Sequence, residues 1–205
     1  MKSLFLNGFK LFIHDNVYEP SDDTWLLMNL ADEVLSRRES SELCVDLGCG
    51  SGVLGLYMLF KNYCRRVFFI DINPYATTNT VINLVENKFM HRGIVVLSEP
   101  YVFIEKADVV LANPPYLPED EYRSIDIYND ISVIGGAEGF ETLFKFIDFA
   151  SEILVENGYL FITYSTLTKP KVVEEYIVSR GFKIIIKRTA KFFYEELIAT
   201  GAVKK

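Results

Sequence analysis

Residues 43–52 read Leu-Cys-Val-Asp-Leu-Gly-Cys-Gly-Ser-Gly, a short apolar strand that runs into three alternate glycines. A helical pattern follows over residues 53–60, and a second apolar strand over residues 67–70 ends at Asp71. Glycines at such a turn let the backbone bend tightly and approach a ligand closely. An acid 23 residues after Gly48 can accept hydrogen bonds from both hydroxyls of a ribose. The spacing favours a nucleoside-binding α/β fold over a plain structural turn.

The rest of the chain continues this alternation of strands and helices. Helix-sized crossovers predict a Rossmann-like, mostly parallel sheet of seven strands with helices on both faces. The last two strands leave no room for a helix between them, so we expect an antiparallel hairpin. Residues 1–40 predict a hairpin around Asn7-Gly8 and a helix that pack on the ligand site, within a single domain over residues 1–205. The further strands are expected at 94–97, 107–112, 159–164, 182–186 and 193–202, and the further helices at 74–86, 140–155 and 171–180.

Composition narrows the function. The chain has 205 residues and a formal net charge of -7, which disfavours nucleic acid as a partner. No apolar run is long enough to cross a bilayer, and the N-terminus lacks the pattern of a signal peptide. The three cysteines, at 44, 49 and 64, lack a CxxC pair and predict reduced thiols in a cytoplasmic protein. The two histidines lack metal-ligand spacing, so we expect no metal site.

The strand at 107–112 leads into Asn113-Pro114-Pro115-Tyr116, which predicts the catalytic loop. Such a loop suits a reaction in which an amide or amino nitrogen on a planar group is the nucleophile. This nitrogen is a weak nucleophile, so it must be held in line with the group that it attacks. The side-chain oxygen of Asn113 and the carbonyl of Pro114 offer two acceptors for its N–H groups, and consecutive prolines stiffen the turn. Tyr116 can place its ring against the planar group. The alternative is a proline-rich turn with a buried tyrosine.

The glycine loop resembles the first motif of S-adenosylmethionine (SAM)-dependent class I methyltransferases, because Val53 replaces the third glycine of the dinucleotide fingerprint. Asn113-Pro114-Pro115-Tyr116 resembles the NPPY motif of methyltransferases that act on glutamine amides or adenine amino groups. Residues 18–24, Tyr-Glu-Pro-Ser-Asp-Asp-Thr, and residues 134–139, Ile-Gly-Gly-Ala-Glu-Gly, are similar to segments of HemK-type protein-glutamine methyltransferases of the short eukaryotic and archaeal branch.

This resemblance implies methylation of the glutamine in the Gly-Gly-Gln motif of a class I translation release factor, with SAM as the cofactor. It implies a carboxylate for the SAM ammonium at Asp46, and an adenine contact at Ser98 or Glu99. It also implies a small zinc-binding activator subunit that pairs with a strand edge, for which residues 94–97 are a candidate, although they also fit an ordinary core strand. The predicted cofactor contacts are Thr24, Asp46, Gly48, Gly50, Gly52, Asp71, Ser98 and Asn113, and the predicted substrate contacts are Asn113, Pro114, Pro115 and Tyr116.

Several alternatives stay open at this point. Thr24 fits a helix cap as well as a cofactor contact, and Gly135-Gly136 fits a plain turn. The same NPPY chemistry could serve an adenine N6-methyltransferase, which needs an extruded or unpaired base. A non-catalytic SAM-binding subunit is the third reading, although such a protein has no need of an intact NPPY loop.

Overall fold

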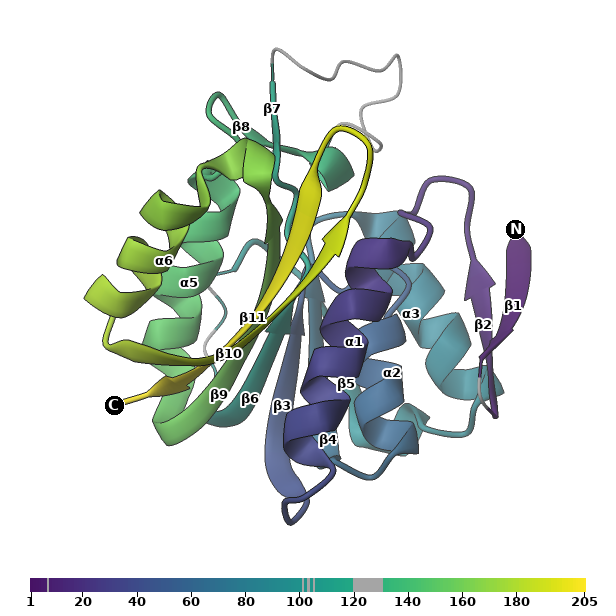
Figure 1. Ribbon diagram of the computed structural model, residues 1–205. Helices are drawn as coiled ribbons and strands as arrows, with labels where there is room; N and C mark the ends of the chain where they lie inside the picture. The colour runs from purple at the N-terminus through teal and green to yellow at the C-terminus, as the bar shows by residue number, and fades with distance from the viewer. Residues whose placement is uncertain (7, 101, 103, 105, 120–130) are drawn as a thin grey trace.

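The computed structural model describes residues 1–6, 8–100, 102, 104, 106–119 and 131–205. Its main sheet has seven strands in the order β10-β11-β9-β6-β3-β4-β5 (Figure 1). All neighbours are parallel except β11, which runs antiparallel to both β10 and β9. The predicted fold class is therefore confirmed. The strands are β3 (Ser41–Leu47), β4 (Cys64–Asp71), β5 (Gly93–Leu97), β6 (Ala107–Ala112), β9 (Leu154–Ser165), β10 (Phe182–Lys191) and β11 (Glu196–Lys204).

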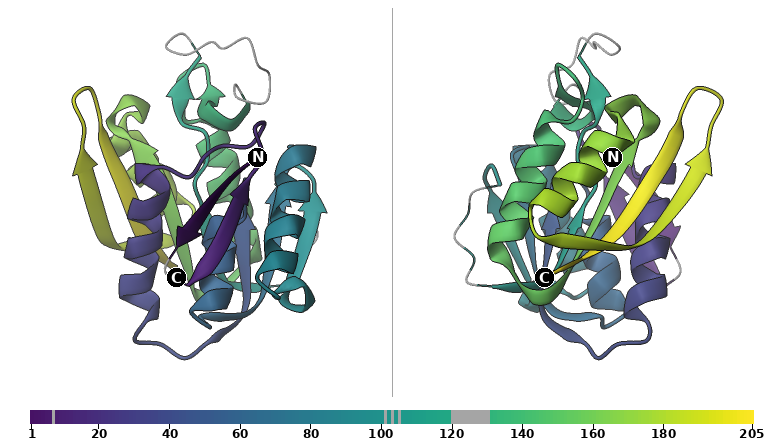
Figure 2. Two further views of the ribbon diagram at one scale, coloured as in Figure 1. Left: turned by 90° about the vertical axis from the view of Figure 1, so that its right-hand side faces the viewer. Right: turned by 60° about the vertical axis from the view of Figure 1, so that its left-hand side comes forward.

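Helices cover both faces of this sheet (Figure 2). One core contains α1 and α2 together with Val109 and Leu111 of β6, and the other contains α5 and α6 together with Val110 and Ala112. Alternate residues of the same strand thus serve opposite cores, as the strand pleat requires. The helices are α1 (Asp22–Leu35), α2 (Val53–Phe60), α3 (Pro74–Glu86), α5 (Glu141–Ile153) and α6 (Pro170–Ser179). None of the helices in the described ranges has the length and apolar character needed for a membrane span.

Asparagine side chains fasten the N-terminal hairpin, β1 (Lys2–Leu6) and β2 (Phe9–Ile13), to α3. Asn79, Asn83 and Asn87 recur every fourth residue, so they lie on one face of the helix. Their amides exchange hydrogen bonds of 2.6–2.9 Å with the backbone of residues 10, 12 and 14. The side chains of α3 therefore provide hydrogen-bond partners for the backbone of β2, as a neighbouring strand would. Asn7, part of the predicted turn, lies outside the described residues.

Several element boundaries differ from prediction, and two of them concern turns. The helix predicted to end at Asn157-Gly158 ends at Ile153, because Leu154 already pairs in parallel with Ala107. Asn157 has a left-handed φ of 62° and lies at a register shift of β9. The Asn157-Gly158 pair therefore marks an irregularity of this strand and not the end of a helix. The last strand begins at Glu196, and residues 192–195 form the hairpin turn.

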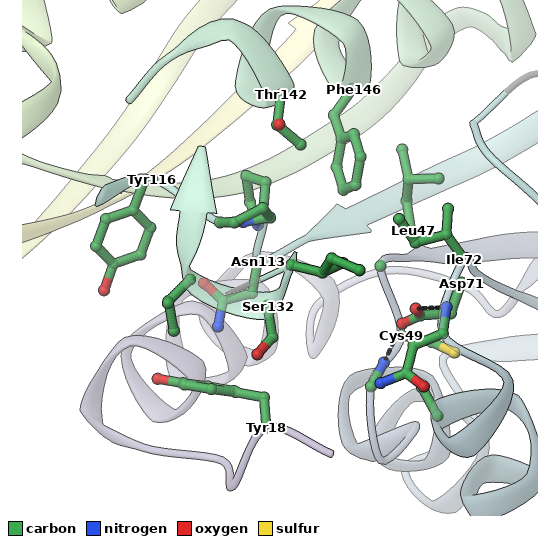
Figure 3. A pocket seen from close by; sticks show the side chains of 18 of the residues that line it. Tyr18, Leu47, Cys49, Asp71, Ile72, Asn113, Tyr116, Ser132, Thr142 and Phe146 are labelled. Atoms are coloured by element: carbon green, nitrogen blue, oxygen red, sulfur yellow. Dashed lines mark hydrogen bonds between the residues drawn. The ribbon is translucent and has the colours of Figure 1, made fainter. Parts of the chain in front are cut away.

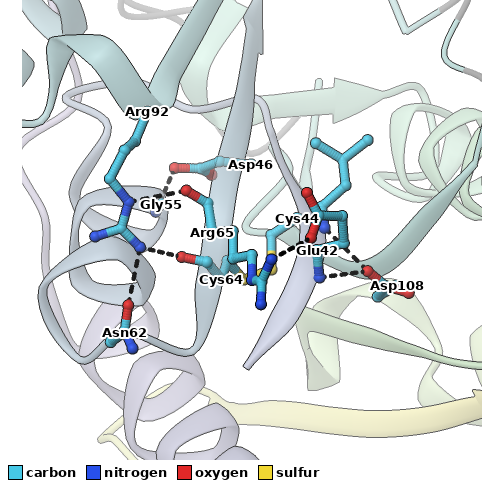
Figure 4. Close-up of a disulfide and its surroundings, with 10 residues drawn as sticks. Glu42, Cys44, Asp46, Gly55, Asn62, Cys64, Arg65, Arg92 and Asp108 are labelled. Atoms are coloured by element: carbon cyan, nitrogen blue, oxygen red, sulfur yellow. Dashed lines mark hydrogen bonds and ion pairs between the residues drawn. A yellow bond between two sulfur atoms is a disulfide. The ribbon is translucent and has the colours of Figure 1, made fainter. Parts of the chain in front are cut away.

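Cys44 of β3 and Cys64 of β4 form a disulfide (Figure 4). Both are fully buried, and their Cα atoms are 5.9 Å apart. The prediction of three reduced thiols is therefore wrong for this pair, whereas Cys49 is a free, buried thiol. β3 and β4 are parallel neighbours, but their register places Ser41 beside Cys64 and Cys44 beside Val67, so the two cysteines are not directly opposite one another. Their separation of 20 residues in the sequence gives no indication that the two cysteines lie close together.

Candidate active site

The glycine loop after β3 and the NPPY loop after β6 begin side by side. β3 and β6 are parallel neighbours, and Leu47 pairs with Ala112 at their carboxyl ends. Gly48 and Asn113 follow directly. The strand order reverses at β3, with β4 on one side and β6 on the other. A ligand crevice is expected at such a switch point.

A cavity of about 420 Å³ lies at this point, within the range of small-molecule sites. Figure 3 shows Asn113, Tyr116 and Tyr18 toward one side of it, and Asp71 and Ile72 toward the other. Leu47 of β3 and Phe146 of α5 add apolar surface. Of the predicted site residues, those that line the cavity are Thr24, Gly48, Gly50, Asp71, Ser98, Asn113, Pro114, Pro115 and Tyr116.

The glycine loop adopts a backbone that side chains disfavour. Gly48, Gly50 and Gly52 have φ values of 68°, 55° and 77°, all in the left-handed region. A Cβ on Gly50 would meet no atom within 4 Å, so the loop leaves open space at this position, while Gly52 packs against Thr80. The loop therefore forms an open cradle beside the cavity.

Asp71, at the end of β4, holds this cradle in place. Its carboxylate accepts hydrogen bonds of 2.8 Å from the backbone N–H groups of Gly50 and Asn73. Burial raises the pKa of Asp71, and these N–H groups offset part of the effect. Since each carboxylate oxygen can accept more than one hydrogen bond, Asp71 can serve the loop and a ribose together.

Asp46 and Gly52 do not line the cavity. Asp46 is 1% exposed, and one of its oxygens accepts the N–H of Gly55 at 2.8 Å. The other oxygen has no hydrogen-bond partner among the described residues. Burial is the main cause that raises the pKa of Asp46 to about 8. Its predicted contact with an ammonium group stays a prediction, and the observed contact is with α2.

We expect Asp46→Asn to become more stable relative to the wild type as the pH rises from about 5 to 8. The folded wild type keeps the Asp46 proton up to about pH 8, whereas an unfolded aspartate loses it near about pH 4. The wild type therefore loses stability over this interval, by up to about 1.4 kcal/mol per pH unit. Asparagine has no such proton to lose. Urea unfolding of both ligand-free proteins across this range would measure the difference, and a pH-independent difference would contradict the prediction.

Hydrogen bonds fix the orientation of the Asn113 amide. Asp23 accepts the Thr24 hydroxyl proton at 3.1 Å, so the Thr24 oxygen is left to accept from the Asn113 NH2 group at 3.2 Å. The Asn113 oxygen accepts the hydroxyl of Thr163, from β9. Because a carboxylate can only accept hydrogen bonds, Asp23 fixes the direction of donation in this series of hydrogen bonds. Thr24 thus contributes to the site as well as to the capping box of α1.

Asp23 also binds the two tyrosines of the cavity. Its second oxygen accepts hydrogen bonds from Tyr18 at 3.0 Å and from Tyr116 at 3.2 Å. Burial, with the charge of Asp23 next, raises the pKa of both phenols well above the ordinary value, so both stay protonated donors. Asp23 is therefore the residue at which the N-terminal segment and the NPPY loop meet.

The segment at residues 134–139 packs directly on the NPPY loop. A Cβ on Gly135 would lie 2.6 Å from the carbonyl oxygen of Pro115, and one on Gly139 would lie 2.6 Å from that of Tyr116. The short strands β7 (Leu117–Pro118) and β8 (Ile134–Gly136) join the two segments in parallel. The glycines thus allow a backbone-to-backbone contact behind the loop, which goes beyond a plain turn.

Sequence reasoning missed four residues of the site. Tyr18 and Asp23 lie inside a quoted motif, but nothing local marks their side chains as convergent. Thr163 and Glu195 come from distant parts of the chain and reach the site only through the pairing of β6, β9 and β11. Ser98 and Glu99 both line the cavity, so the choice between them for the adenine stays open.

The comparison with protein families agrees with this geometry. Residues 12–132 match the family described as the methyltransferase small domain. The chain belongs to this methyltransferase family. The matched range includes the glycine loop, Asp71 and the NPPY loop.

Relatives of this methyltransferase place it more narrowly. It is 32% identical over 203 residues to a protein of Methanocaldococcus jannaschii that carries the name protein N5-glutamine methyltransferase, with 96% of each chain covered. This confirms the resemblance to protein-glutamine methyltransferases. Among solved structures, the Mtq2–Trm112 complex of E. cuniculi is described as responsible for methylation of the eRF1 translation termination factor. Mtq2 superposes with a TM-score of 0.64 at 25% identity, over 93% of this chain and 99% of that one.

A more distant structure shares the fold. The tRNA m1G37 methyltransferase of M. jannaschii superposes with a TM-score of 0.72 at 21% identity, over 99% of this chain and 56% of that one. This similarity shows the methyltransferase fold and carries no information on the substrate of the present protein.

Proposed function

We propose that this methyltransferase transfers a methyl group from SAM to the side-chain amide nitrogen of a protein glutamine, in the Gly-Gly-Gln motif of a translation release factor. The observation that carries the proposal is the fixed Asn113 amide at the edge of the cavity. Its oxygen is bonded to Thr163 and its nitrogen to Thr24. An amide oxygen has two lone pairs, so Asn113 retains an acceptor for an N–H group of the substrate.

The cavity fits SAM in two respects. The left-handed loop at Gly48 and Gly50, with open space at Gly50, suits a ligand that lies close to the backbone. Asp71 lies beside the cradle with acceptor capacity for a ribose, and Ile72 adds apolar surface for an adenine. When bound, SAM supplies an electrophilic methyl group. The residues named here would hold it at the side of the cavity opposite Tyr116.

The NPPY loop would orient the substrate nitrogen. Asn113 and the carbonyl of Pro114 accept its two N–H groups, which leaves the lone pair free to point along the direction of attack. The tyrosines keep their own protons, and their hydroxyl groups already donate to Asp23. No base is needed before transfer, because the positive charge of the sulfonium would pass to the nitrogen with the methyl group, and the cationic nitrogen would then lose a proton readily. The role of these residues is therefore orientation and exclusion of water.

An adenine amino group is the second candidate acceptor, because the same two hydrogen-bond acceptors suit its planar NH2 group. The buried carboxylate of Asp23 and that of Glu195 line the same cavity. Among the described residues, the lining has four acidic ones, Asp23, Asp71, Glu99 and Glu195, against one lysine, Lys145. This excess of negative charge opposes the approach of a phosphate backbone, so this candidate is disfavoured. A non-catalytic role is disfavoured by the ordered Asn113 network.

The edge of the sheet at β5 supports an activator subunit. β5 pairs with β4 alone among the described strands, and Ile94 and Leu97 on it are 40% and 57% exposed. Val81 and Val85 of α3, the helix that contacts β5, are exposed as well. A small zinc-binding subunit that adds a strand here, as the family resemblance implies, would cover this edge. We expect the protein to act in the cytoplasm, together with its proposed release-factor substrate. We further expect residues 1–205 to form one domain, since the N-terminal hairpin is bonded to α3.

Mass spectrometry of a release factor after incubation with the protein, SAM and an activator subunit tests this function. We expect a gain of one methyl group on the glutamine of the Gly-Gly-Gln peptide. An adenine oligonucleotide in a parallel reaction serves as the competing acceptor. Methyl transfer to the oligonucleotide, or to no acceptor at all, would contradict the proposal.

A further inference from the structure

The tip of the β10–β11 hairpin carries features that the methyl-transfer site does not use. Residues 192–195 form a turn closed by the N–H of Phe192 and the carbonyl of Glu195, 2.8 Å apart. Figure 1 shows this tip at the end of the sheet where β7 and β8 lie. That end also holds the cavity, so the tip stands beside its mouth.

Glu195 turns from this tip into the cavity. It is one of the lining residues, and its charge contributes to the raised pKa of both Tyr18 and Tyr116. Its oxygen Oε2 is shielded from solvent and has no hydrogen-bond partner among the residues that the structure describes. An unsatisfied buried carboxylate oxygen is costly, and a ligand N–H group would remove that cost.

Phe193 and Tyr194 point the other way. Their side chains are 93% and 89% exposed, and their rings contact one another with centroids 4.9 Å apart. Neither lines the cavity, so a small acceptor held inside cannot reach them. Exposed aromatic side chains are enriched among the anchors of protein interfaces. A ligand that contacts Glu195 and also the rings of Phe193 and Tyr194 must extend from the cavity over the surface of the protein.

We propose that residues 192–195 are a docking element for the folded protein substrate. Phe193 and Tyr194 contact the surface of the domain that carries the target glutamine, and Glu195 accepts a hydrogen bond from a backbone N–H of the peptide that enters the cavity. Nucleic acid is the poorer fit, because four acidic residues and a single lysine, Lys145, line the cavity in the part of the chain that the structure describes. This inference rests on the proposed function.

Steady-state kinetics on two acceptors test the docking element. The acceptors are the folded release factor and a short peptide with the Gly-Gly-Gln sequence. For the double variant Phe193→Ser/Tyr194→Ser we expect KM for the folded factor to rise about 10-fold with kcat unchanged. For the short peptide we expect wild-type kinetics. Phe5→Ser is the matched control, since Phe5 is 77% exposed on β1 and does not line the cavity.

Variants of Glu195 test the hydrogen bond that we propose between its carboxylate and the peptide. Glu195→Ala should raise KM about 10-fold for both acceptors, whereas Glu195→Gln keeps an acceptor oxygen and should stay within about 3-fold of wild type. Titration with SAM alone should give the wild-type affinity in all variants, which shows that they fold. A wild-type KM for the folded factor in the double variant, with the wild type active, overturns the docking element alone. A wild-type protein that methylates no glutamine overturns both proposals.

Discussion

Asn113→Ala should lower kcat for glutamine methylation by about 10²- to 10³-fold while SAM still binds. The substitution removes an oriented acceptor from the substrate NH2 group, and losses of this size are typical when one preorganised polar group is deleted from an active site. The rest of the loop is held independently, because Tyr116 is bonded to Asp23 and Gly135 packs on Pro115. Single-turnover methylation and calorimetric titration with SAM would measure the two effects separately.

Thr163→Val provides the graded comparison. It removes the hydroxyl that donates to the Asn113 oxygen, but it leaves Asn113 in place. We expect a loss of about 10-fold, since the amide keeps its bond to Thr24 and is only partly released. Turnover by Asn113→Ala close to that of the wild type would refute the role assigned to the side chain.

Gly135→Val should lower kcat by about 10²-fold without loss of SAM binding. A Cβ at this position would lie 2.3 Å from the carbonyl oxygen of Gly139 and 2.6 Å from that of Pro115. Both neighbours are backbone atoms, so the two segments must separate. Displacement of a reacting group by about 1 Å costs about this much. Kinetics on the short peptide would measure the loss free of any effect on docking.

Gly181→Val is the matched control for this substitution. Gly181 has a left-handed φ of 86°, which side chains disfavour, but a Cβ there would meet no atom within 4 Å, whereas Gly135 has the close contacts without a left-handed φ. It lies between α6 and β10, outside the cavity lining. We expect lower thermal stability and unchanged kcat. Equal kcat values for Gly135→Val and the wild type would show that the segment at 134–139 does not position the NPPY loop.

The parts of the fold that the sequence predicts are those with strong local signals. The helices at 53–60 and 74–86 and the strand at 107–112 have the predicted bounds, because a glycine loop, an N-terminal proline and an apolar run mark their ends. The Asn157-Gly158 signal failed because a left-handed residue suits a strand irregularity as well as a helix end. Local sequence cannot distinguish the two.

The site also divides into features with a local sequence signal and features that depend on long-range contacts. The loops at 48–52 and 113–116 could be placed because each follows a strand whose end faces the crevice. Asp46 was assigned to the cofactor from its place before the glycines, yet its side chain points to α2, since alternate residues of β3 face opposite cores. The contacts of Thr163 and Glu195 depend on which strands become neighbours across 50 residues or more. The Cys44–Cys64 disulfide likewise depends on β3 and β4 becoming neighbours.

The final strand of the chain is inserted between two strands that are synthesised before it. β11 separates β10 from β9, so β10 has no place in the sheet until β11 has left the ribosome. Until then the outer edge of β9 lacks a partner, and Glu195 has no fixed position at the cavity. A nascent chain that stops short of residue 196 therefore cannot yet hold Glu195 at the cavity.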